Sequence, residues 1–152
     1  MRFAATFFVL SILSAVPLCA FASEMDDNVP DANALAVLQA KADQAQPKDQ
    51  CFLYAELVSQ MTDLAGRQYG SGDTGKASAT LSLVQRYAEK IRAGIAMDSK
   101  KLKNAELLMQ HTSFRLKDLL SSASYEDREA LRATLKQLDQ VQSQLMMQVF
   151  RK

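Results

Sequence analysis

The feature that most constrains the fold is an apolar stripe that keeps its helical phase from Leu81 to Leu119. Apolar residues recur there at alternating steps of three and four, and only Asp98 and Thr112 are polar. Because an α-helix has about 3.6 residues per turn, such positions lie on one face. We therefore expect one unusually long helix, from about Thr74 to Ser121.

A break near the middle of this stretch is the alternative. A loop between residues 96 and 99 would normally reset the phase, which favours the continuous helix. Asp98 could nevertheless cap a separate helix that begins at Ser99, and Gly94 would permit a bend. An unbroken helix would be on the order of 70 Å long. A compact bundle cannot cover that length, so we expect part of the stripe to lie exposed and to mark a partner surface.

Three further segments have helical periodicity, and the chain is predicted to be an all-α antiparallel bundle or hairpin array. The first segment, about Asp31 to Gln46, lies between two prolines, and the second runs from about Lys48 to Tyr69. A long C-terminal helix is expected from about Tyr125 to Phe150, with apolar residues at coiled-coil spacing. Toward its end this stripe is widened by Val141, Met146 and Phe150.

The first 22 residues are typical of a secretory signal peptide. Arg2 precedes an uncharged apolar run from Phe3 to Leu18, and Ala20-Phe21-Ala22 supplies the small residues of a cleavage site. The run is shorter than the roughly 20 apolar residues of a membrane span. We expect cleavage between Ala22 and Ser23, which would release the mature protein into the periplasm or the medium.

Cleavage would leave an acidic, flexible segment at residues 23–30 and one helical domain at 31–152. Loss of Arg2 would bring the 18 basic residues to 17, equal to the 17 acidic ones. A mature chain without net charge is not expected to bind nucleic acids in general. We also expect no transmembrane segment in it. Cys19 would leave with the leader, so Cys51 would have no partner for an internal disulfide.

The stretch from Ala65 to Ala77 resembles the middle of a tetratricopeptide repeat. The residues that match that pattern in order are Gly66, Tyr69, Gly72, Asp73, Lys76 and Ala77. The turn is one residue shorter than in the family, and no second copy is present, whereas stable arrays need about three. The resemblance implies a helical hairpin at Gly70 to Gly75 and a role in protein binding. The whole chain is also similar to exported bacterial helical proteins of uncharacterised function.

Few residues suggest catalysis. His111 is the only histidine, and Arg115 and Asp118 follow at one-turn spacing, an arrangement that would suit an oriented general base or a polar edge beside the core. Cys51 would open the second helix, where it could be buried, bridge two chains or act as a reactive thiol. The sequence has no CxxC, P-loop or GxSxG motif, and we expect no metal site and no cofactor.

One run of the chain is basic. Only Glu89 and Asp98 oppose the cations between residues 86 and 103, which are Arg86, Lys90, Arg92, Lys100, Lys101 and Lys103. The run is either a solvated helix face or a patch for anionic lipid, cell-wall polymer or an acidic partner. The leading functional hypothesis is a non-enzymatic exported protein that binds another protein or a second copy of itself. The alternatives are a small thiol or hydrolytic enzyme that uses Cys51 or His111, and a ligand-binding helical bundle.

Overall fold

The computed structural model describes residues 31–96 and 100–151, in which every regular element is an α-helix. These elements are α1 (Ala32–Gln44), α2 (Pro47–Gly70), α3 (Thr74–Ile95), α4 (Leu102–Ser122) and α5 (Arg128–Phe150). The prediction of an all-α antiparallel bundle is confirmed.

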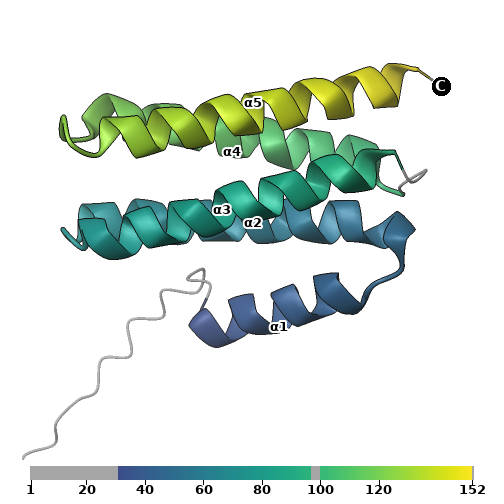
Figure 1. The fold of residues 1–152 in the computed structure, drawn as a ribbon, viewed down its shortest axis with the longest axis horizontal. Coiled ribbons are helices and arrows are strands. Elements are labelled where there is room, and N and C mark those ends of the chain that lie inside the picture. Colours follow the sequence, from purple (N-terminus) through teal and green to yellow (C-terminus); the bar gives the residue numbers. More distant parts are fainter. Residues whose placement is uncertain (1–30, 97–99, 152) are drawn as a thin grey trace, which may run out of the picture.

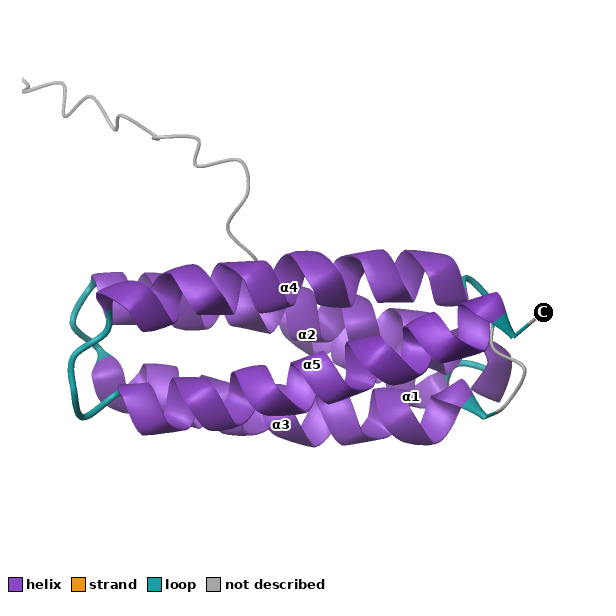
Figure 2. Ribbon diagram, turned by 90° about the horizontal axis from the view of Figure 1, so that it is seen from above, coloured by secondary structure: helices purple, strands orange, loops and turns teal. Residues whose placement is uncertain are grey.

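The helices form three layers. The hairpin of α4 and α5 lies over the hairpin of α2 and α3, and α1 covers the other side of the second pair (Figure 1). Across the two hairpins, α4 contacts α2 and α5 contacts α3. The turns within both hairpins lie at one end of the bundle, and the connections α1–α2 and α3–α4 lie at the other end (Figure 2).

The prediction of a single helix from Thr74 to Ser121 is wrong, because α3 ends at Ile95 and a separate helix, α4, begins at Leu102. Lys101 has a φ of 57°, a left-handed conformation that no residue inside an α-helix adopts. The backbone N–H of Lys100 donates to the carbonyl of Lys48 in α2, at 2.7 Å, and not to a carbonyl of its own helix. The alternative cap at Asp98 lies outside the described residues.

The expected exposure of the stripe is also wrong. Leu119 is partly buried, and the other apolar members in α3 and α4 are buried: Leu81, Val84, Ala88, Ile91, Ile95, Leu102, Ala105, Met109 and Leu116. After the break, α4 turns back and lays its half of the stripe against α2 and α5. Both halves therefore enter the core of a single chain.

The other helix boundaries shift by a few residues. The first helix ends at Gln44, the second begins at Pro47, and the last begins at Arg128 because residues 124–127 lie in the turn before it. Proline suits the first position of a helix, where its missing N–H has no role. The expected leader at residues 1–22, with its expected cleavage site, and the segment 23–30 lie outside the described residues.

The turn between α2 and α3 depends on Gly72, which has a φ of +82°. A side chain in this left-handed conformation would meet the backbone, so glycine is strongly favoured. One turn before the end of α2, Gly66 lets α4 approach closely, since a Cβ there would lie 3.3 Å from Leu119. The helical hairpin expected at Gly70 to Gly75 is present.

Among the described residues, none of the helices combines the length and the apolarity that crossing a membrane requires.

Replacement of Gly72 by alanine is expected to lower the free energy of unfolding by about 1 kcal/mol, because alanine is strained at positive φ. Gly75→Ala is the matched control, since Gly75 is helical and an added Cβ would meet open space. That variant should be unchanged or slightly more stable. Urea unfolding followed by circular dichroism measures both, and equal stabilities of the two variants would contradict the role of Gly72.

Candidate functional site

The residues suggested for acid–base catalysis do not form a site together. His111 is exposed on α4, and no hydrogen bond or ion pair joins it to another described residue. Arg115 instead reaches across to α2, where its guanidinium pairs with Asp63 and donates to the Ser59 hydroxyl at 2.6 Å. Asp118 is exposed beside this pair. Arg115 therefore joins two helices and does not orient His111.

Cys51 is fully buried between α2 and α3. Its thiol lies 3.9 Å from the carbonyl oxygen of Ile91, and Gly94 is packed so closely that an added Cβ would lie 3.3 Å from the Cys51 Cβ. Of the three outcomes left open by the sequence, burial is the one observed. A thiol in this position cannot reach a second chain or a substrate while α2 and α3 stay packed.

The basic run between residues 86 and 103 does not form one patch. Lys90 pairs with Asp43 of α1, and Arg92 pairs with Glu89 on its own helix. Arg86 lies over the ring of Tyr87. The remaining three lysines lie beyond the break, where Lys101 covers the ring of Phe52 and Lys100 and Lys103 are exposed.

A polar cluster that sequence reasoning missed holds α1 against the bundle. The Tyr54 hydroxyl and the Lys90 ammonium both donate to Asp43 Oδ1, each at 2.7 Å, and Lys90 also donates to the Tyr54 oxygen at 3.3 Å. The rings of Tyr54 and Tyr87 stack at 5.9 Å, and Lys90 lies over both. Because these residues come from three helices, no spacing within one helix could reveal the cluster.

The partners in this cluster shift each other's titration. The hydrogen bonds from Lys90 and Tyr54 lower the pKa of Asp43 below its ordinary value of 3.8. The hydrogen bond to Asp43 raises the pKa of Lys90 above 10.5, and burial raises the pKa of Tyr54 above 10.0. Asp43 and Lys90 are thus charged at neutral pH and Tyr54 is neutral, which suits a structural clamp and not a proton-transfer site.

The surface that sequence reasoning did not anticipate lies along α3 and α5. Two adjoining hollows of about 770 and 680 Å³ share Arg92, Gln144 and Met147. We call them together the α3–α5 groove. At its end near the C-terminus Met147 is 65% exposed and Phe150 is 81% exposed. The expectation that Met146 and Phe150 widen the core stripe is therefore wrong, whereas Val141 is buried as expected.

The α3–α5 groove combines this apolar end with uncompensated positive charge. Arg132, Lys136 and Arg151 line it, and none of them forms an ion pair with another described residue. Asp139 also lines it, but its carboxylate is 3.9 Å from Lys117. Exposed methionine and aromatic side chains beside free cations are typical of a surface that binds another molecule.

Within the described part of the chain, no group of three histidine, cysteine or acidic side chains could hold a metal ion. Compared with known proteins, the chain matches no protein-family model, and no curated protein or solved structure is similar enough to count as a match. Its function is therefore inferred from its own surface.

Asp43→Asn is expected to lower the free energy of unfolding at pH 7 by up to about 1 kcal/mol, since the ion pair is partly exposed. Because the pKa of Asp43 is lower in the folded chain than its ordinary 3.8, its contribution is present above that pH and is lost as pH falls further. Urea unfolding at pH 7 and at pH 3 measures this. The variant and the wild type should differ less at pH 3 than at pH 7.

Asp139→Asn is the matched control. Asp139 pairs with Lys117 alone, over a longer distance, and its carboxylate has no third side chain comparable to Tyr54 in the cluster on α1. A loss at pH 7 as large as that of Asp43→Asn would show that the cluster on α1 is no more than an ordinary surface pair.

Burial of Cys51 predicts that a thiol reagent will not label the folded chain produced from Ser23 onward, and will label it fully in denaturant. Lys117→Cys adds an exposed thiol on α4 as a control for reagent activity. The absorbance of the thiolate released from the reagent measures the labelling of both cysteines. Labelling of Cys51 in the folded chain as fast as that of the added cysteine would contradict its burial. It would then support the hypothesis of a thiol enzyme.

Proposed function

We propose that the chain is an exported, non-enzymatic protein that binds another protein through the α3–α5 groove. The observation that carries this proposal is the exposure of Met147 and Phe150 next to the groove. Both side chains lie at the end of a helix whose core contacts are made by other residues, Leu138, Val141 and Leu145, so the core of the bundle does not use them. Burying such a pair against a partner would stabilise a complex by roughly 1.5–3 kcal/mol per side chain.

The partner is a segment of another protein that carries both apolar and acidic side chains. Arg132, Lys136 and Arg151 provide three cations without ion-pair partners among the described residues. An amphipathic helix with leucines on one side and glutamates at its edges would satisfy both the apolar and the charged parts of the groove. The groove runs along α5, with Arg92 and Ile95 at the end of α3 on its other side. Such an open, elongated surface suits an elongated ligand.

An enzyme that uses Cys51 or His111 has less support. Cys51 is buried, and His111 stands exposed on α4 without a carboxylate from the described residues to orient it. Nucleophilic and general-base catalysis both need such groups within hydrogen-bond reach of each other at an accessible surface.

Export remains part of the proposal and rests on the pattern of residues 1–22. The resemblance of Ala65 to Ala77 to a tetratricopeptide repeat is in keeping with a binding role. It contributes no site, since the exposed apolar residues of the groove lie elsewhere.

The test is binding of a labelled amphipathic peptide of leucine and glutamate at helical spacing, measured by fluorescence anisotropy. The wild-type chain should bind it, and a peptide of the same composition in scrambled order should bind far more weakly. Met147→Asp combined with Phe150→Asp should weaken binding at least tenfold, because it removes apolar contact and repels the glutamates. Protein recovered from the exported fraction should begin at Ser23.

Phe114→Asp is the matched control, since Phe114 is also a highly exposed aromatic residue but lies on α4, outside the groove. It should change the affinity less than twofold. An equal loss in both variants would mean that binding is not located at the groove. A concentration-dependent dimer that only the Met147 and Phe150 changes abolish would assign the groove to a second copy of the chain.

A further inference from the structure

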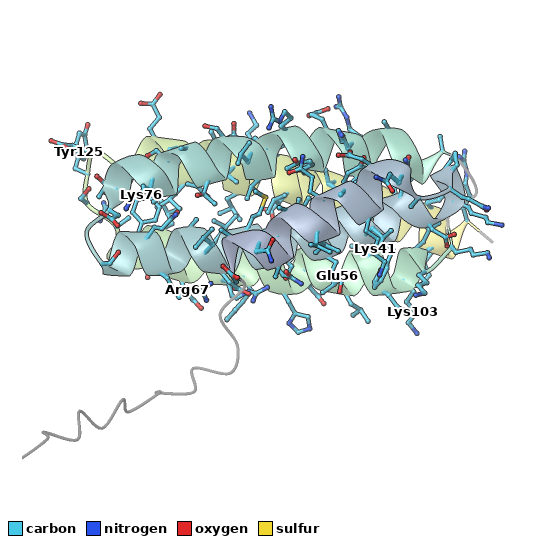
Figure 3. The ribbon with its side chains drawn as sticks, turned by 90° about the horizontal axis from the view of Figure 1, so that it is seen from below. Lys41, Glu56, Arg67, Lys76, Lys103 and Tyr125 are labelled. Carbon is cyan, nitrogen blue, oxygen red and sulfur yellow. The ribbon has the colours of Figure 1, made fainter. Side chains whose placement is uncertain are left out.

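Four lysines from three separate segments gather at the end of the bundle where α2 and α4 begin. Lys41 lies on α1, Lys48 in the first turn of α2, and Lys100 and Lys101 directly before α4. All four line one open groove of about 790 Å³. Figure 3 shows Lys41 and Lys103 toward this end and Lys76 near the opposite end. We call the groove lined by Lys41, Lys48, Lys100 and Lys101 the lysine groove.

The positive charge of this groove is only partly offset within the described part of the chain. None of its four lysines forms an ion pair with another described residue, although the described lysines 76, 90 and 117 all do. Asp49 and Glu56 are the acidic members of the lining, so four cations face two anions. Four exposed ammonium groups in one hollow repel each other, and an anion between them relieves that repulsion.

The placement of the lysines on the helices adds to the positive potential. The first turn of a helix carries partial positive charge and unpaired N–H groups, so it favours acidic side chains and disfavours lysine. Lys48 nevertheless lies in the first turn of α2, next to Asp49, and the first turn of α4 contains no acidic residue. Neither helix has a side-chain cap, and the two starts are joined by the hydrogen bond from Lys100 N–H to the Lys48 carbonyl.

The lining is not purely polar. Phe52 and Leu53 belong to it, and the Lys101 ammonium stays 4.7 Å from the centre of the Phe52 ring. This contact places one ammonium over an aromatic ring of the lining, whereas the side chains of Lys41, Lys48 and Lys100 are exposed. A compact anion with several oxygens fits such a set better than a single carboxylate, because each ammonium offers three donors.

We propose that the lysine groove binds a phosphate group, either as a free oxyanion or as the headgroup of an anionic phospholipid. The groove lies apart from the α3–α5 groove and shares no lining residue with it. The two binding events are therefore separable, and the proposal stands whether or not the chain binds a protein partner.

The experiment measures binding of the mature chain to two probes. Inorganic pyrophosphate is titrated by calorimetry, and vesicles of phosphatidylcholine with 30% phosphatidylglycerol are tested by co-sedimentation, each at low and at physiological salt. The variant is Lys48→Gln with Lys100→Gln, because the described hydrogen bonds of both residues use backbone atoms that the change leaves in place. It should weaken binding about 25-fold, or roughly fivefold for each lysine.

Lys76→Gln with Lys117→Gln removes the same charge far from the groove and should weaken binding less than twofold. Binding of pyrophosphate that only the groove variant loses supports a free oxyanion, and selective loss of vesicle binding alone supports a lipid headgroup. The proposal is overturned if the wild-type chain binds neither probe, or if the control variant loses as much affinity as the groove variant.

Discussion

The burial of α2 against three neighbours is the constraint on which the rest of the structure depends. α3, α4 and α1 each cover a different side of it, so that nearly every residue from Cys51 to Val58 and on to Ala65 is wholly or largely removed from water. The polar members of this surface are paired, as Thr62 donates to the Val58 carbonyl and Ser59 accepts from Arg115. A helix so enclosed requires that the segments which form α3 and α4 both return to it, and one straight rod could not do so.

The packing of α3 and α4 against their neighbouring helices also separates the basic residues into two groups. Cations on the sides of α3 and α4 that face another helix, such as Lys90 and Arg115, are used to tie neighbouring helices together. Lysines in the connections at the end of the bundle have no such neighbour, and they remain available to a ligand. One basic run in the sequence therefore has two separate physical roles, decided by whether a carboxylate from another helix comes within reach.

How much of the fold could be predicted depends on how local its signals are. The hairpin after α2 was predictable because Gly72 and its polar neighbours form a turn signal within a few residues. The break before α4 could be offered only as an alternative, because the contact seen there, the hydrogen bond from the Lys100 N–H to the Lys48 carbonyl, joins residues about fifty positions apart. The candidate site was missed for a similar reason. Phe150 continues an apolar pattern, and only the absence of a covering helix in the described fold leaves it exposed.

The sequence by itself determined which residues share a helix face, where the prolines and glycines end a helix, and hence that the chain is all-α. Only the tertiary structure decided that the long stripe is folded back on itself, that Cys51 is enclosed, and that Met147 and Phe150 are not. The physical reason is that periodicity acts over one or two turns, whereas burial requires a second surface. That surface is supplied by segments distant in the chain, and a stripe carries the same pattern whether or not another helix covers it.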